Sequence, residues 1–142
     1  MTRIVIAVVL VGIAIAVALI IEKRRPAPPT QPTWAVPSQV DRDDFDRPDA
    51  PWLLAVFTSA TCTTCKDVLV KVRPLETDVV AVQEIEAVER KDLHQRYAID
   101  AVPMLLVVDA EGVVRGSLVG PASAEDIWLA VSDVRDNRPD ID

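Results

Sequence analysis

The stretch from Ala55 to Cys65 limits the fold more narrowly than any other part of the sequence. An apolar run from Trp52 to Phe57 predicts a buried strand, and the small polar residues after it predict a turn. Cys62 and Cys65 then open a predicted helix, and they are the only cysteines in the chain of 142 residues. A helix N-terminus stabilises an anion through its free N–H groups and its dipole, so Cys62 is expected to be a reactive thiolate. Cys65, one turn later, is placed to attack a mixed disulfide on Cys62.

Residues 4–21 form an uninterrupted apolar stretch. As a helix this stretch would be about 27 Å long, close to the hydrocarbon thickness of a bilayer, which is about 30 Å. We therefore expect a single transmembrane anchor that contacts the lipid bilayer. A cleaved signal peptide is the alternative, because residues 16–18 (Ala-Val-Ala) fit the small-residue cleavage pattern. The apolar run continues past that site, which favours the uncleaved anchor.

Prolines recur through residues 22–37 and predict an extended, proline-rich linker there. Three basic residues at 23–25 follow the apolar stretch after Glu22, whereas only Arg3 and the amino terminus precede it. By the positive-inside rule this difference places the domain on the cytoplasmic side of a cell membrane, with the extracytoplasmic side as the alternative. A cytoplasmic position would keep the cysteine pair reduced at rest, which suits a reductant better than an oxidant.

The net charge of −7 argues against a nucleic-acid partner, because phosphate binding needs a clustered basic surface. A zinc site needs four ligands, and beyond the cysteine pair only His94 is of suitable softness, so no metal is predicted. His94 itself is expected to be a solvated helix residue. Glu84, Glu86 and Glu89 are expected to form a solvated face.

Residues 38–136 are predicted to be one domain of alternating strands and helices. The helix that carries the cysteines shows one apolar stripe, Cys65, Val68, Leu69 and Val72. Pro74 is expected to end that helix. The next predicted elements are a strand over 79–85, a helix over 87–97 and a strand over 101–108.

A hairpin turn over 109–112 is predicted to lead into a returning strand over 113–119. Ser123 and Asp126 resemble a capping box that opens the last helix. A short edge strand is predicted at 34–36, and residues 137–142 are expected to be a fraying polar tail. The first two strong strands need a crossover and should be parallel, whereas the last two should be antiparallel. An α/β fold with a mixed sheet and flanking helices follows.

Three features together resemble the thioredoxin family over residues 34–135. They are Cys62-Thr63-Thr64-Cys65-Lys66 after a buried strand, the segment from Tyr97 to Pro103, and the hairpin with its Val119-Gly120 strand end. The resemblance implies a thioredoxin-like fold and thiol–disulfide exchange on protein disulfides, with an upstream electron donor or acceptor and no organic cofactor. Cys62 would be the attacking nucleophile and Cys65 the resolving cysteine.

In that family the proline before the third strand is cis and faces the cysteine pair, and the resemblance assigns this role to Pro103. The backbone of Val102 would then be free to pair with an extended substrate strand. Thr61 and Thr63, which flank Cys62, are the other expected substrate contacts.

Three departures from the family pattern limit the resemblance. The residues between the cysteines are two threonines, and Thr61 stands where thioredoxin has a tryptophan. The buried aspartate of the family falls at Val56, and its companion lysine falls near Val82. Cys65 would therefore lack its usual base, so water or a threonine hydroxyl would have to serve, or exchange would be slow. A redox-inactive interaction module tethered to the membrane is the alternative function.

Overall fold

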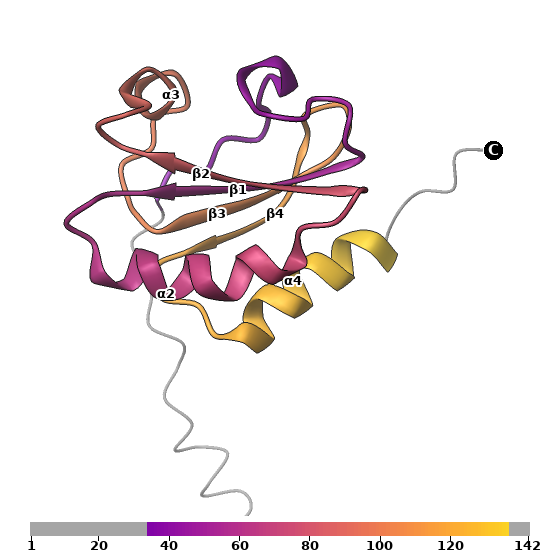
Figure 1. Ribbon diagram of the computed structural model, residues 1–142. Coiled ribbons are helices and arrows are strands. Elements are labelled where there is room, and N and C mark those ends of the chain that lie inside the picture. The colour runs from indigo at the N-terminus through magenta and orange to yellow at the C-terminus, as the bar shows by residue number, and fades with distance from the viewer. Residues whose placement is uncertain (1–33, 137–142) are drawn as a thin grey trace, which may run out of the picture. The chain divides into compact units, whose positions relative to one another are not determined.

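Four strands form the sheet at the centre of residues 34–136, the part of the chain that this computed structural model describes (Figure 1). In sheet order they are β2 (Val80–Glu86), β1 (Trp52–Thr58), β3 (Met104–Val108) and β4 (Val114–Val119). β1 and β2 are parallel, whereas β1 with β3 and β3 with β4 are antiparallel. The sheet is mixed, which confirms the prediction.

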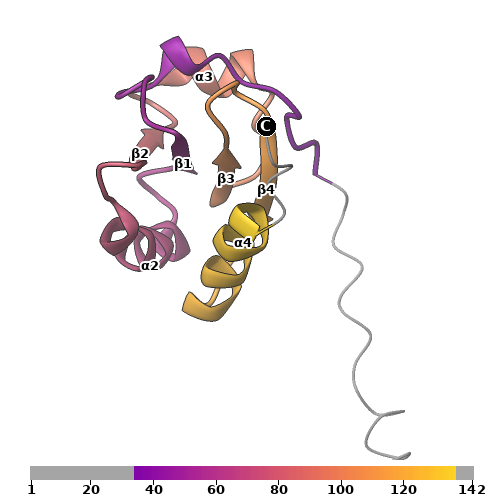
Figure 2. The same cartoon turned by 90° about the vertical axis from the view of Figure 1, so that its right-hand side faces the viewer.

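Helices lie on both faces of this sheet. α2 (Thr63–Val72) and α4 (Ala124–Asp136) cover one face, while α3 (Lys91–Arg96) and the short 3-10 helix η1 (Arg42–Asp44) lie on the other (Figures 1 and 2). A second 3-10 turn, η2 (Arg73–Leu75), follows α2. The predicted α/β class with flanking helices is confirmed.

β1 is buried on both faces, which explains its continuous apolar sequence. All residues from Leu53 to Phe57 are 0% exposed. Alternate side chains of the strand enter different apolar clusters: Phe57 packs with Leu93 of α3, and Val56 packs with Val68 of α2. The buried strand was predicted correctly because its apolar residues follow one another without alternation.

The ends of α2 and α4 agree with the sequence signals. α2 buries the whole predicted stripe, Cys65, Val68, Leu69 and Val72. It ends at Val72, ahead of Pro74. Before α4, the Asp126 N–H donates to the Ser123 hydroxyl (3.1 Å), and the Ser123 N–H donates to the Asp126 carboxylate (2.9 Å). This reciprocal pair confirms the predicted capping box.

The edge strand predicted at 34–36 is wrong. The chain there is irregular, and it contacts the sheet through an isolated antiparallel bridge between Gln39 and Val113. Pro37 precedes this bridge and has no N–H to donate, which prevents regular pairing from continuing toward Trp34.

Two further elements begin later than predicted. The helix predicted over 87–97 starts only at residue 91, because residues 87–90 form a turn instead. The strand predicted over 101–108 starts at Met104, after Pro103, which cannot donate a ladder hydrogen bond.

The predicted anchor at 4–21, most of the linker at 22–37 and the tail at 137–142 lie outside the described residues. Among residues 34–136, no helix is both long enough and apolar enough to cross a membrane. The anchor and the predicted domain limits stay predictions.

Arg42 is a buried cation that joins three parts of the chain. The residue is the first of η1 and is only 7% exposed. One Nη atom donates to the carbonyl of Asp109 (2.7 Å), and the other donates to the carbonyls of Ala50 (2.8 Å) and Arg47 (3.3 Å). The guanidinium therefore ties η1 to the start of β1 and to the β3–β4 turn.

The segment Ser38–Val40, which we call the N-terminal clip, is bonded to the β3–β4 hairpin. The Val40 N–H donates to the Gly112 carbonyl (2.8 Å), and the Val114 N–H donates to the Ser38 carbonyl (3.0 Å). Gly112 has φ +80°, and a Cβ at this position would overlap the carbonyl oxygen of Val40. The hairpin thus needs glycine both for its backbone conformation and for the close approach of the clip.

Replacing Gly112 with alanine is expected to lower the free energy of unfolding by about 2 kcal/mol or more, because it adds a backbone clash to the cost of a left-handed conformation. Gly120→Ala is the matched control, since Gly120 has φ +89° but no atom lies within 4 Å of the place that an added Cβ would take. That variant should lose only about 1 kcal/mol. Urea unfolding measures both values, and equal losses would contradict the assigned role of the clip.

Candidate active site

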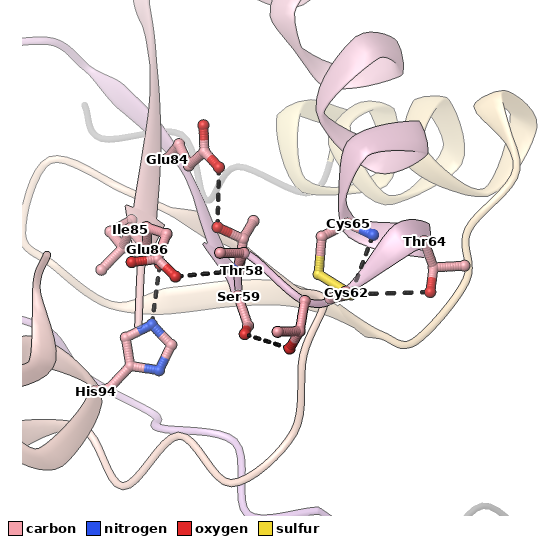
Figure 3. The surroundings of a disulfide bond; sticks show 11 residues. Thr58, Ser59, Cys62, Thr64, Cys65, Glu84, Ile85, Glu86 and His94 are labelled. Carbon is pink, nitrogen blue, oxygen red and sulfur yellow. Dashed lines mark hydrogen bonds between the residues drawn. A yellow bond between two sulfur atoms is a disulfide. The ribbon is translucent and has the colours of Figure 1, made fainter. Parts of the chain in front are cut away.

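Cys62 and Cys65 form a disulfide at the start of α2, where the loop from β1 enters the helix (Figure 3). Their Cα atoms are 5.4 Å apart. Cys62 is the N-cap residue, and its Sγ accepts the Cys65 N–H at 3.2 Å. Cys62 is half-buried, whereas Cys65 is 1% exposed. The sulfur of Cys62 is therefore the more accessible of the two, and it lies at the positive end of a helix dipole.

A tight turn leads into the first cysteine. The Cys62 N–H donates to the Ser59 carbonyl (3.0 Å), and the Ser59 and Thr61 hydroxyls are 3.2 Å apart. The Thr64 hydroxyl lies 3.8 Å from the sulfur of Cys62. Among the described residues, the hydrogen-bond partners of the Cys62 sulfur are therefore the Cys65 N–H and the Thr64 hydroxyl, and neither is a charged group.

Glu86 joins this turn to the end of β2 (Figure 3). Its Oε1 accepts the Ala60 N–H (2.9 Å), and its Oε2 accepts the N–H groups of Val88 (2.7 Å) and Glu89 (3.0 Å). The Glu89 and Val88 bonds lower the pKa of the Glu86 carboxyl most, and the Ala60 bond and the nearby His94 lower it further. Glu86 is consequently ionised at neutral pH and able to accept all three bonds.

The prediction that Glu84, Glu86 and Glu89 form a solvated face agrees with the structure for Glu84 and Glu89, which are exposed, and is wrong for Glu86, which is half-buried. Glu84 accepts a hydrogen bond from the Thr58 hydroxyl (2.9 Å), next to the turn. One sequence signal could have identified Glu86. It is a carboxylate at the end of a strand, and such a side chain can accept the N–H groups of the residues two and three positions later in the following turn.

His94 is not the solvated residue that the sequence predicts. Its ring is half-buried, lies edge-on to Phe57 with centroids 5.1 Å apart, and has Nε2 2.9 Å from the Ile85 carbonyl oxygen. α3 is only six residues long, so it offers too few positions for a periodic pattern to show which side faces the sheet.

The other expected site residues lie around the same edge of the sheet. The Val102–Pro103 peptide bond is cis, as the resemblance implies. Met104 pairs with Phe57, so Pro103 lies beside the end of β1 from which the loop to Cys62 departs. Pro103 is buried and Val102 half-buried. Their role in substrate binding stays a prediction.

Thr61 and Thr63, the remaining predicted substrate contacts, are both exposed. They precede and follow Cys62 directly, so they border the accessible sulfur. Contact of either residue with a substrate stays a prediction.

Val56 occupies the position where the family has its buried aspartate. It is 0% exposed and packs in an apolar cluster with residues of α2, β3 and α4. Val82 is half-buried against the same cluster. The region that holds an acid in thioredoxins is filled here by aliphatic side chains.

No family model matches the sequence, and no curated protein matches it. Solved structures do match. A mutant thioredoxin from Halobacterium salinarum NRC-1 is 26% identical, with a TM-score of 0.55 over 69% of this chain and 93% of the other. The reduced thioredoxin pre-protein of Schistosoma mansoni is 20% identical, with a TM-score of 0.51 over 60% and 80%. A malarial protein is 9% identical, with a TM-score of 0.53 over 58% and 94%.

These matches agree with the features found in the structure itself. The sheet order, the cis proline before β3 and the cysteine pair at the start of α2 occur together. The described part of the chain is therefore a thioredoxin-like domain with a Cys-x-x-Cys disulfide.

Proposed function

We propose that this protein is a membrane-anchored thiol–disulfide oxidoreductase that reduces protein disulfides through Cys62 and Cys65. One observation carries the proposal: the half-buried sulfur of Cys62 lies at the N-terminus of α2, in a disulfide with a buried Cys65. A thiolate at such a position is stabilised by the free N–H groups of the helix, and a thiolate is the nucleophile of disulfide exchange.

The proposed reaction has two steps. In the reduced protein, the Cys62 thiolate attacks one sulfur of a substrate disulfide, forms a mixed disulfide, and releases the other substrate sulfur as a thiolate. The Cys65 thiolate then attacks the Cys62 sulfur, which releases the second substrate thiolate and forms the Cys62–Cys65 disulfide. Two electrons pass to the substrate, and a dithiol donor must then reduce the pair again.

The absence of an acid at Val56 sets this domain apart from thioredoxin itself. Deprotonation of Cys65 would fall to water or to a hydroxyl, and the Thr64 hydroxyl near the Cys62 sulfur is one such group in the structure. The aliphatic surroundings of Val56 are also the observation that favours the second candidate, an interaction module without electron transfer.

The cytoplasmic side of the membrane remains part of the proposal. It rests on the basic residues after the stretch 4–21 and on the positive-inside rule. If the domain lies outside instead, disulfides formed by the thiols of exported proteins become the better substrates.

A redox titration of the full-length protein, with free thiols counted by mass, tests the function. A midpoint at or below about −270 mV is expected and would support a reductant in a reducing compartment. A midpoint near −120 mV would mark an oxidant and move the domain outside the cytoplasm. If the two cysteines do not interconvert in any redox buffer, the redox function is wrong and the interaction module replaces it.

A further inference from the structure

The loop from β1 to the cysteine pair has few bonds to the rest of the fold. Ala60 and Thr61 are exposed, and the Cys62–Ser59 backbone bond closes the loop only on itself. Across residues 34–136, the bond from the Ala60 N–H to Glu86 is the one that links residues 59–61 to a side chain of another element.

Glu86 is well placed to hold that loop, because its own position is fixed. It is the last residue of β2 and lies opposite Thr58 in the parallel pairing of β1 and β2. Its second oxygen is held by the N–H groups of Val88 and Glu89. The carboxylate thus extends from the rigid edge of the sheet to a loop that carries reactive chemistry (Figure 3).

The position of the Cys62 sulfur depends on this loop. Ala60 is two residues before Cys62, inside the turn that the Cys62–Ser59 bond closes. Movement of that turn would shift the N-cap residue and weaken the contact between its Sγ and the Cys65 N–H.

We propose that Glu86 is a positioning residue: its bond to Ala60 keeps the Cys62 sulfur at the N-terminus of α2 in the reduced protein as well as in the disulfide. The inference rests on the proposed function, because it matters for exchange only if Cys62 is the attacking thiolate. Glu86 has two possible effects on that thiolate, and they have opposite signs. Positioning stabilises the thiolate through the helix N–H groups, whereas the negative charge of the carboxylate destabilises it.

Alkylation of Cys62 across a pH range separates the two effects. The full-length chain with Cys65→Ser leaves one thiol, and its iodoacetamide rate gives the Cys62 pKa. With Glu86→Ala added, that pKa is expected to rise by about half a unit to one unit, the size that one lost hydrogen bond imposes. Glu86→Asp keeps the charge but is one methylene shorter, so it should also raise the pKa. A pKa that falls with alanine and is unchanged with aspartate would overturn the proposal in favour of charge alone.

Glu89→Ala is the matched control. It removes a carboxylate of the same charge from the same turn, and that exposed carboxylate accepts no hydrogen bond within the described residues. The Cys62 pKa of the Cys65→Ser chain should be the same with and without Glu89→Ala. Circular dichroism checks that each variant is folded. If Glu89→Ala shifts the pKa as much as Glu86→Ala, the positioning role is wrong.

A second readout is the equilibrium with glutathione in the chain that keeps both cysteines. Glu86→Ala should shift that equilibrium about threefold to tenfold toward the disulfide, because a less stable thiolate destabilises the dithiol form. The two hypotheses fail separately. Wild-type protein that does not cycle would refute the proposed function, while the alkylation rates would still report on Glu86. If the wild-type protein cycles but the Glu86 variants leave the Cys62 pKa unchanged, only the positioning role is refuted.

Discussion

Replacing Cys65 with serine is expected to abolish turnover and to leave Cys62 joined to its substrate in a stable mixed disulfide. The serine hydroxyl cannot displace the sulfur of Cys62, so the second step of exchange is blocked while the first still proceeds. Reduction of a model protein disulfide should fall to the uncatalysed rate. Non-reducing electrophoresis with mass spectrometry would show the trapped adduct and identify the substrate cysteine.

Cys62→Ser is the matched control for this experiment. It keeps Cys65, which is only 1% exposed, and should therefore trap nothing. The two variants differ only in which sulfur remains, so the comparison assigns the nucleophile directly. Adducts on Cys65 in the control, or none on Cys62 in the first variant, would contradict the assigned roles.

Replacing Arg42 with alanine is expected to cost about 3 kcal/mol or more in the free energy of unfolding. The loss leaves the Ala50 carbonyl without the donor that the structure gives it, while the carbonyls of Asp109 and Arg47 keep only their backbone donors, the N–H groups of Gly112 and Ala50. The unpaired Ala50 carbonyl costs about 1–3 kcal/mol, the two other lost hydrogen bonds cost about 1 kcal/mol each, and the packing of the side-chain stem is lost as well. Urea unfolding followed by circular dichroism measures the change.

Two further variants separate the causes of that loss. Arg42→Met keeps most of the stem, so it should recover only the packing part and remain well below wild type. Arg73→Ala removes an exposed arginine whose ion pair with Glu84 is 3.4 Å long, and it should change stability by less than about 1 kcal/mol. An Arg42→Met variant as stable as wild type would show that the three carbonyls do not need the guanidinium.

The apolar pattern of the sequence predicts the elements that bear the cysteine pair. The uninterrupted run of β1, the stripe on α2 and the capping box before α4 are each contained in a few neighbouring residues. Local signals of this kind indicate an element and the side that it buries. They also place the two cysteines at the junction between β1 and α2.

Contacts between distant residues could not be predicted in this way. Arg42 bonds to Asp109, which is 67 residues away, and Ala60 bonds to Glu86, which is 26 residues away. A polar residue in an irregular or exposed stretch carries no periodic signal for its partner, so the sequence predicts neither contact. The buried side of His94 was missed for a related reason, because α3 is too short for a pattern.

The N-terminal clip has a mechanical consequence. A pulling force applied to the chain at Trp34 would reach the clip before it reached β1, because the clip lies between them in sequence. The Val40–Gly112 and Ser38–Val114 bonds join antiparallel backbone segments, and such bonds run across the chain direction. Tension along the chain would therefore load both bonds together, in shear, and pass into the β3–β4 hairpin. β1, the strand that leads to the cysteines, would carry none of this load until the two bonds of the clip had broken.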